Sequence, residues 1–532
     1  MILYNGNFIT MDKRNKFAQA VKIKGNKFVK VSTNEEILSM KFPGEECIDL
    51  EGKTVIPGLN DSHMHLYGFG LTLQMVNLMN VQSIDEIILK VKSYINDKNI
   101  AYNRWIQGRG WNQDYFTGDK RFPTRMDLDQ ISTKHPIILT RACGHMAVVN
   151  SKTLEVCGIN HLTEEVEGGA FDIDLGLFRE NALSLIFENM PKPRVDDIKE
   201  TLLLAMKYAN SKGLTSIQTD DLSHAGNYKQ VLKAYEALRD EGKLTCRIYE
   251  QSLLNKEELI EFLSLGYNTG VGNEFFKIGP LKVLSDGSLG ARTAALTKPY
   301  ADDPSTRGIM CYSQEELDDL IGTAHQAGMQ IAVHCIGDRA MYMVFESYEK
   351  ILEKDYRANH RHGIIHCQIM DEYLLNKYKE LDICAYVQPI FLHYDLHIVE
   401  DRVGKELAKT SYAFKSMIDK GIHTSFGTDC PVEALDTMSN IHCAVTRSDL
   451  SGEPIGGWNP KERLSVYEAL YHYTQEGAYT SFEENTKGSI TENKFADLVV
   501  LKDDILKTKR SNIKDIEVLM TFVGGKMVYK NC

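Results

Sequence analysis

The sequence predicts an α/β protein: a (β/α)8 TIM barrel with a large insertion after strand 1 and a small composite β-sandwich domain formed by both termini. Three observations predict this fold. Eight apolar strand candidates alternate with amphipathic helices, strand signals recur at both ends of the chain, and a long interval follows the first barrel strand. We expect the sandwich in residues 1–58 and 485–532, the barrel in 59–484, and the insertion at about 70–200.

Both terminal segments have the pattern of short strands joined by tight turns. Gly25-Asn26 interrupts a run of alternating apolar residues and is typical of a hairpin. The alternating positions are Val21, Ile23, Val29 and Val31. Near the other end, a strand is expected at 496–501, and two more between 519 and 528 are joined by Gly524-Gly525. Neither segment is long enough to bury a core alone, so we expect them to pack together.

The barrel is predicted from strands that are mostly separated by helices. After the stretch that ends at His65, the predicted strands are 214–220, 247–250, 276–284, 331–334, 363–366, 383–388 and 424–429. Helices are expected at 196–211 and 227–241, and a capping box at Ser313–Glu316 opens another that ends at Gly328. Regular βα alternation implies parallel strands. An open doubly wound sheet is the alternative, but no G-x-G-x-x-G motif follows the first strand.

The interval between His65 and residue 196 is far longer than one helix and its loops require. It contains strand-like stretches at 105–112 and 136–141, followed by Cys143-Gly144-His145. Mixed strands and glycine-rich turns inserted at the C-terminal face of a barrel indicate a lid over the site.

Composition restricts the class of partner and the compartment. The 532-residue chain has a net charge of −12, which argues against a general nucleic-acid binder and an anionic membrane surface. It has neither a signal-peptide pattern nor the roughly 18 consecutive apolar residues of a membrane span. Its eleven cysteines form no CxxC pair, which favours reduced thiols in a cytoplasmic protein. We expect a small-molecule substrate; the oligomeric state is open, with a homodimer as one option.

Polar residues capable of binding a metal stand at the C-terminal ends of several predicted strands. They are His63, His65, Lys282, His334, His366 and Asp429. In a parallel barrel these ends share one face, so the side chains become neighbours. Any one of the histidines or Asp429 could serve only a loop or the core, but their joint position favours a divalent metal. Zinc is the first choice, with one or two ions; manganese, iron and nickel stay open.

Lys282 is unusual in this set because an ammonium group repels a cation. Either it is carboxylated, and so becomes a ligand that bridges two metals, or it binds a substrate carboxylate.

Several motifs resemble the amidohydrolase superfamily and, within it, the YtcJ-like metal-dependent hydrolases that include N-substituted formamide deformylases. The motifs are Pro57–His65, Gly108–Asn112, Leu281–Ala294, His334–Ala340, Ile365–Gln368 and Gly427–Pro431. The resemblance covers almost the whole chain. The ligands that it implies are His63, His65 and Asp429 for one ion and His334 and His366 for a second, with carboxylated Lys282 between them. The branch commonly has Glu before the sixth-strand His, whereas Ile365 stands here. Residue 365 points away from His366, so we expect an intact ligand and a changed packing contact.

The implied reaction is hydrolysis of a non-peptide amide-type C–N bond, of a formamide or N-acyl small molecule, by a metal-activated hydroxide. Asp429 is the expected base, which then delivers the proton to the leaving nitrogen. Candidates for orienting the substrate are Trp111, His145, Asp286 and Arg292, although loop structure or lid packing explains each of them equally well. Two alternatives stay open: an esterase or isomerase on the same scaffold, and a catalytically inactive scaffold protein.

Overall fold

The computed structural model describes residues 1–531, apart from the side chains of residues 224 and 225. The chain divides into two compact units, one made of residues 1–69 with those from 195 onward, the other of Gly70–Arg194. We describe each unit by itself. Within the described part, no helix is long and apolar enough to cross a membrane.

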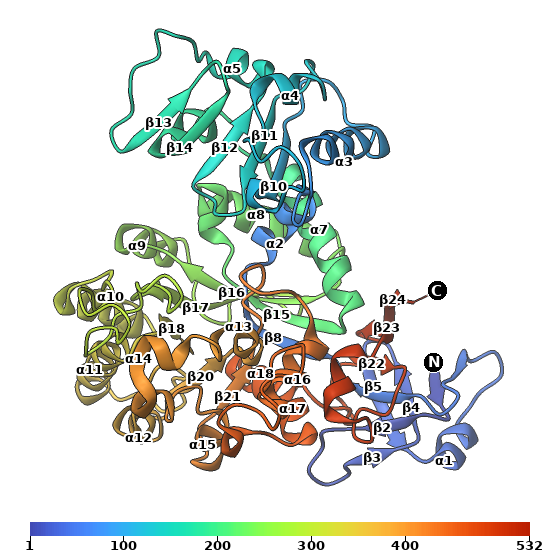
Figure 1. Cartoon of the computed structure of the whole chain (residues 1–532). Coiled ribbons are helices and arrows are strands. Elements are labelled where there is room, and N and C mark those ends of the chain that lie inside the picture. Colours follow the sequence, from blue (N-terminus) through green and yellow to red (C-terminus); the bar gives the residue numbers. More distant parts are fainter. Residues whose placement is uncertain (532) are drawn as a thin grey trace. The chain divides into compact units, whose positions relative to one another are not determined.

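The first unit is built on eight parallel strands in chain order, with β8 at one edge and β21 at the other (Figure 1). They are β8 (Leu59–Met64), β15 (Leu214–Thr219), β16 (Arg247–Leu253), β17 (Phe276–Leu284), β18 (Ile331–Cys335), β19 (Gly363–His366), β20 (Cys384–Val387) and β21 (Thr424–Phe426). Just beyond β21 the backbone N–H of Asp429 donates to the carbonyl of His63 at 2.8 Å. The predicted barrel is therefore confirmed as a nearly closed sheet of eight parallel strands.

Helices follow the strands because their sequences combine apolar faces with capped ends. They are α7 (Val195–Ser211), α8 (Tyr228–Asp240), α9 (Lys256–Ser264), α10 (Gln314–Gln326), α11 (Asp338–Lys354), α12 (Glu372–Glu380), α13 (Leu392–Asp395), α14 (Val399–Ala408), α15 (Phe414–Asp419), α16 (Thr437–Thr446), α17 (Val466–His472) and α18 (Gln475–Thr480). The predicted capping box is present in α10: Ser313 accepts the N–H of Glu316, whose carboxylate accepts the N–H of Ser313.

Strands from the two ends of the chain pair in one sheet (Figure 1). Its order is β24 (Lys526–Lys530), β23 (Val518–Val523), β22 (Leu498–Leu501), β7 (Thr54–Pro57), β2 (Asn7–Ile9), β3 (Phe17–Ala18). A four-stranded sheet, β5 (Lys27–Ser32), β4 (Ala20–Lys24), β1 (Ile2–Tyr4), β6 (Cys47–Asp49), shares an apolar core with it. Around the predicted hairpin, Phe28 is buried and Val29 is 38% exposed. The inward pattern therefore differs from the predicted one, because the β4–β5 register shifts between Lys22 and Ile23.

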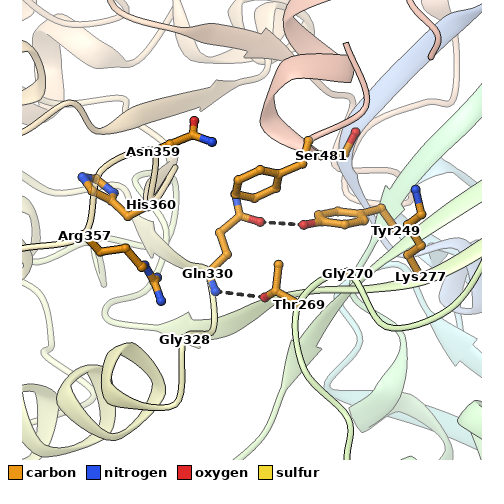
Figure 2. Close-up of a pocket in the computed structure, with 11 residues that line it drawn as sticks. Tyr249, Thr269, Gly270, Lys277, Gly328, Gln330, Arg357, Asn359, His360 and Ser481 are labelled. Carbon is orange, nitrogen blue, oxygen red and sulfur yellow. Dashed lines mark hydrogen bonds between the residues drawn. The ribbon is translucent and has the colours of Figure 1, made fainter. Parts of the chain in front are cut away.

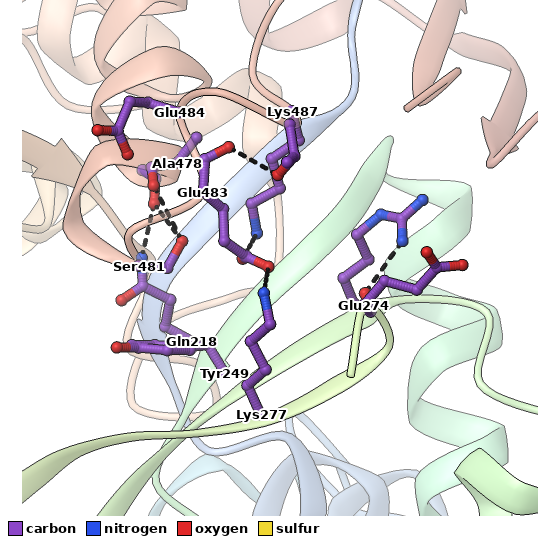
Figure 3. A network of polar contacts seen from close by, with 12 residues as sticks. Gln218, Tyr249, Glu274, Lys277, Ala478, Ser481, Glu483, Glu484 and Lys487 are labelled. Atoms are coloured by element: carbon purple, nitrogen blue, oxygen red, sulfur yellow. Dashed lines mark hydrogen bonds and ion pairs between the residues drawn. The ribbon is translucent and has the colours of Figure 1, made fainter. Parts of the chain in front are cut away.

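The N-terminal end of the barrel is filled by polar contacts to α18 and the loop after it. Gln218 of β15 donates to the carbonyl of Gly477 at 2.9 Å, and Lys277 of β17 pairs with Glu483 at 2.6 Å (Figure 3). Beside this network lies a cavity of about 360 Å³, where Tyr249 donates to Gln330 at 2.9 Å (Figure 2). These contacts close the end of the barrel opposite to the predicted metal ligands.

The second unit is a mixed six-stranded sheet with its own apolar cores. The strand order is β13 (Gly169–Asp172), β14 (Leu177–Glu180), β12 (Met146–Val149), β11 (Ile137–Arg141), β10 (Ile106–Trp111), β9 (Val76–Asn77). The longer helices are α3 (Ile84–Asp97), α4 (Arg125–Asp129) and α5 (Ser151–Cys157). A complete core of this kind indicates that the unit folds around its own buried residues.

Candidate metal centre

The end of β8 is held against the last barrel strand by a buried carboxylate. Asp61 accepts the N–H of Thr428 at 3.1 Å and its hydroxyl at 2.7 Å, and also the N–H of His63 at 3.2 Å. Burial raises the pKa of Asp61 to about 7, and the hydrogen bonds from Thr428 oppose that rise. Asp61 therefore joins two segments that each carry a predicted metal ligand, His63 and Asp429.

Each of the four predicted histidine ligands has one ring nitrogen within hydrogen-bond distance of an oxygen. The contacts are His63 Nδ1 with Gln251 Oε1 at 2.6 Å, His65 Nδ1 with the Asp220 carbonyl at 3.0 Å, His334 Nε2 with the Gly287 carbonyl at 3.1 Å, and His366 Nδ1 with Gln388 Oε1 at 2.9 Å. A carbonyl oxygen only accepts, so the contacting nitrogen carries the proton. In a neutral ring the other nitrogen is then unprotonated, which is the form that binds a metal.

The imidazoles lie close to one another and to Asp429. Ring centroids are 5.2 Å apart for His63 and His65, 5.4 Å for His63 and His366, and 4.4 Å for His334 and His366. One ligand atom from each of His63, His366 and Asp429 lies within 4.8 Å of the others. Asp429 Oδ1 is 3.3 Å from His63 Nε2 and 3.2 Å from His65 Nε2. The predicted ligands of the first, sixth and eighth strands are thus brought together, with His334 beside them.

Two residues of this group have strained backbones. His366 has a φ of 80° and Asp429 a φ of 57°. Such angles are uncommon for residues that carry a Cβ, and they persist only where the surrounding structure enforces them. These φ angles turn the side chains of His366 and Asp429 away from the direction of a regular strand. As a result, both side chains face the same point as His63.

Lys282 is buried among these groups, with 1% of its surface exposed. Its Nζ lies 3.1 Å from His63 Nε2. Burial lowers the pKa of Lys282, and the negative charges of Asp220 and Asp429 only partly oppose this. The amine is therefore more readily neutral than an exposed lysine, and it lies directly beside a predicted metal ligand.

The pKa values of the groups at this site are set by burial and by the charges of neighbouring side chains. Burial and the charge of Lys282 lower the pKa of His334 to about 3. Burial would raise the pKa of Asp429, but its contacts with His63 and His65 lower it well below the usual value. Burial opposes protonation of His65, yet Asp429 raises the pKa of that ring to about 9. The result is an anionic Asp429 facing nitrogen ligands.

The residues present fit a divalent ion. Asp429 Oδ1 is buried and accepts no hydrogen bond from the described residues, although two imidazoles stand next to it. Buried carboxylate oxygens without hydrogen bonds are rare and costly in folded proteins. Nitrogen and oxygen ligands in this number are those that zinc and related ions take. An ion held by His63, His366 and Asp429 would give these atoms a partner, and His65 lies beside Asp429.

Two of the four predicted substrate contacts lie in the barrel unit, and both have partners within the protein. Asp286 accepts the backbone N–H groups of Ala295, Ile336 and Gly337 and lies 3.4 Å from His334 Nε2. Arg292 pairs with Asp302 at 2.9 Å. Through these contacts Asp286 supports His334, and Arg292 forms a surface ion pair. The roles of both residues toward a substrate stay predictions.

The other two lie in the second unit. Trp111 is fully buried there, and its indole N–H donates to the carbonyl of Leu139 at 2.9 Å. His145 is exposed, lies 3.0 Å from Glu180 and lines a cavity of about 610 Å³ within this unit. Trp111 is thus occupied by packing, whereas His145 is available for binding. For both residues, a role toward a substrate stays a prediction.

The residues that orient the ligands were not singled out from the sequence. Gln251 and Gln388 hold His63 and His366, and Asp61 holds the two strand ends together. In the sequence, these residues are marked only as polar side chains at a strand end or in an otherwise apolar strand. Polar side chains of this kind also occur in many loops, so they do not identify a support of a metal ligand. Ile365, which departs from the family pattern, is fully buried in an apolar cluster with Ala332. Its neighbour His366 faces the site.

Comparisons with known proteins extend over nearly the whole chain. The model of the amidohydrolase family matches residues 46–529. YtcJ of Bacillus subtilis (strain 168) is 34% identical over 541 residues, which cover 99% of each chain. N-substituted formamide deformylase of Arthrobacter pascens is 26% identical over 549 residues, covering 100% of this chain and 98% of its own. The crystal structure of an uncharacterized metal-dependent hydrolase from Pyrococcus horikoshii OT3 has a TM-score of 0.80 and 30% identity, covering 96% of this chain and 98% of its own.

Proposed function

Because the chain belongs to the amidohydrolase family, we propose that it uses a divalent metal to hydrolyse a non-peptide amide C–N bond of a formamide or N-acyl small molecule. Family membership and the metal-dependent hydrolase neighbours make it a hydrolase of C–N bonds. The substrate class is supported by one relative that acts on N-substituted formamides. The observation that carries the proposal is the convergence of the His63 and His65 ring nitrogens on a buried Asp429 oxygen that accepts no hydrogen bond from the described residues.

A divalent ion at this centre, for which we propose zinc, supplies Lewis-acid activation of water and of the substrate carbonyl. His63, His65, His366 and Asp429 would hold it, and His334, whose ring lies beside His366, would serve a second ion; the closeness of His63, His366 and Asp429 supports this assignment. Gln251 and Gln388 keep the ligand nitrogens pointed inward. The ten described cysteines are free thiols, which supports a reducing compartment such as the cytoplasm.

Asp429 is the residue that moves the proton. Its carboxylate is anionic, buried and aimed at the same point as the histidines. Oδ1 takes a proton from the attacking water and later delivers it to the leaving nitrogen. In the overall reaction, one amide and one water give a carboxylate and an ammonium product. Asp429→Asn keeps the shape of the side chain and removes the base.

Lys282 is proposed to be carboxylated. The neutral amine of Lys282 and carbon dioxide give a carbamate and a proton. This reaction turns the lysine side chain beside His63 into an oxygen ligand. A carbon-13 NMR spectrum of the metal-loaded enzyme in labelled bicarbonate is expected to show a protein carbamate signal that Lys282→Ala lacks. A signal that persists in Lys282→Ala, or no signal in the active wild-type enzyme, contradicts this assignment.

The test of the function is a panel of N-substituted formamides, N-acyl amino acids and esters, assayed on protein of measured metal content. We expect turnover of an amide class, reduced at least about a hundredfold in Asp429→Asn, because the contribution of a positioned acid or base is about 10²–10⁴-fold. His63→Ala is expected to lose both metal and turnover.

The matched control is His423→Ala, since His423 lies at the opposite end of the last barrel strand, beside Glu476. It is expected to keep its metal and its rate. Two outcomes contradict the proposed function. One is full turnover by metal-loaded, folded Asp429→Asn. The other is a purified wild-type protein that has a metal content near zero and no activity after metal loading.

A further inference from the structure

Three residues with hydrogen-bond acceptors follow strands that carry or adjoin the predicted metal ligands, and none of the three belongs to the predicted ligand set. Gln368 follows His366 at the end of β19, Asp395 ends α13 after β20, and Glu433 follows Asp429 after β21. They therefore come from three neighbouring strand ends on the face that carries the ligands.

Gln368 and Asp395 are linked by a weak contact that leaves one amide oxygen without a partner. Gln368 Nε2 donates to Asp395 Oδ2 at 3.5 Å, and the hydroxyl of Tyr412 donates to the same oxygen at 2.7 Å. Gln368 is 2% exposed, and its Oε1 accepts no hydrogen bond from the described residues. Since the amide nitrogen reaches Asp395, the unsatisfied oxygen of the same amide stands at the edge of that carboxylate.

Glu433 adds a second carboxylate to this group. Burial raises the pKa of Glu433 to about 7, and repulsion from the charges of Asp395 and Asp429 adds to the rise. Burial likewise raises the pKa of Asp395 to about 6. Both side chains are only half-buried, so a ligand can reach them.

Neither carboxylate is paired with a cation of the described residues. Among the described residues, no lysine, arginine or histidine forms an ion pair with Asp395 or Glu433, although the structure has many such pairs elsewhere. Half-buried carboxylates are costly unless a cation or several donors compensate them. The Gln368 amide contacts Asp395, and Glu433 lies close enough for charge repulsion from Asp395 to be felt, so this region offers acceptors that no cation of the described residues pairs with.

We propose that Gln368, Asp395 and Glu433 form a subsite for a cationic group, an ammonium or guanidinium, on the part of the substrate beyond its scissile amide. This inference rests on the proposed function and names its substrate class: small amides whose amine half carries a second, positively charged nitrogen. A charged N–H group donates to the two carboxylates and to the free amide oxygen, which satisfies all three.

The kinetic test compares ω-ammonium N-alkylformamides, with two to five methylenes between the nitrogens, and methyl-terminated formamides of equal length. Each reaction consumes one water and gives formate and an alkylammonium product. We expect kcat/KM for the best cationic member to exceed that of its neutral partner by about tenfold or more, mostly through KM. In Asp395→Asn and Glu433→Gln this ratio is expected to fall toward one.

Glu353→Gln is the matched control, because Glu353 is an exposed carboxylate near the C-terminal end of α11, away from the metal end of the barrel. It removes one charge and is expected to keep the cationic preference. A ratio near one in the wild-type enzyme, or an unchanged ratio in Asp395→Asn, overturns the subsite.

A binding measurement separates this inference from the proposed function. Butylguanidinium and its neutral isostere butylurea are titrated by calorimetry into metal-loaded wild-type enzyme. Tighter binding of the cation, lost in Asp395→Asn but kept in Glu353→Gln, supports the subsite even if no formamide is turned over. Equal binding overturns it, and so does a lower metal content in Asp395→Asn and Glu433→Gln, which would assign the residues to an inorganic ion.

Discussion

At the scale of single residues, the metal centre depends on which ring nitrogen of each histidine carries the proton. Gln388 accepts at His366 Nδ1 and so keeps Nε2 unprotonated and turned inward. The same arrangement holds for His63 and Gln251. An imidazole without such an acceptor rotates and exchanges its proton, which weakens it as a ligand.

Gln388→Leu is therefore expected to weaken metal binding by about 10–100-fold while the fold stays intact. Competition with a chromophoric chelator measures the affinity. Gln326→Leu, which changes an exposed glutamine at the end of α10, is the control and is expected to bind metal as tightly as the wild-type protein. Unchanged affinity in Gln388→Leu would show that the glutamine does not support the ligand.

Candidate ligands that lie close together in the structure could be predicted from the sequence, whereas the residues that support them could not. A histidine at the end of an apolar strand has few other roles when several such strands form one barrel, which is why His63, His334 and His366 stand out. Gln388 and Gln251 occupy similar positions, but a glutamine has no chemistry that singles it out. Only the distances to the rings reveal what they do.

At the scale of elements, a second group of histidines stabilises the N-terminal ends of the barrel strands. His360 Nδ1 accepts the backbone N–H of His362 at 3.0 Å, and its Nε2 lies 3.2 Å from the carbonyl of Leu381. Burial lowers the pKa of His360 to about 4, and the charge of Arg357 adds to this while Asp382 opposes it. The ring is neutral in the folded protein and fixed in one tautomer.

This arrangement predicts a loss of stability in acid. The unfolded pKa of histidine is about 6.5, so protonation of His360 favours the unfolded chain; its contribution is complete above pH 6.5 and is lost as the pH falls toward 4. His360→Gln removes the titrating group. The variant should be less stable than the wild-type protein at pH 7, and the difference should shrink by at most about 3 kcal/mol by pH 4. Urea unfolding curves at both pH values measure it, and a constant difference contradicts the prediction.

At the scale of the whole barrel unit, the sheets formed by the chain termini are attached to the barrel by a buried ion pair. Arg247 of β16 pairs with Asp497, which precedes β22, through two hydrogen bonds of 2.7 and 3.0 Å. Both side chains are almost fully buried, and the guanidinium stacks on Phe495 at 3.8 Å. Arg247 leads directly into the strand that carries Gln251, so this attachment also supports the metal end.

Asp497→Ala leaves the Arg247 charge buried without a partner and is expected to lower the free energy of unfolding by about 3–5 kcal/mol. Replacement of both residues by leucine is expected to cost less than the single change, because no unpaired charge remains. The control is Glu517→Ala, which breaks the half-exposed pair with Lys502 and should cost less than about 1 kcal/mol. Equal costs for the buried and exposed pairs contradict this account.

The sequence by itself determined the order of strands and helices and the family, and it predicted six candidate metal ligands. These follow from local patterns: apolar periodicity, caps, and ligand-type side chains at strand ends. Only the tertiary structure decided which oxygens hold the imidazoles, that Asp286 accepts backbone N–H groups beside His334, and that Gln368 contacts Asp395. The physical reason is that hydrogen bonds and charge compensation depend on distances between segments far apart in the chain, which no local pattern encodes.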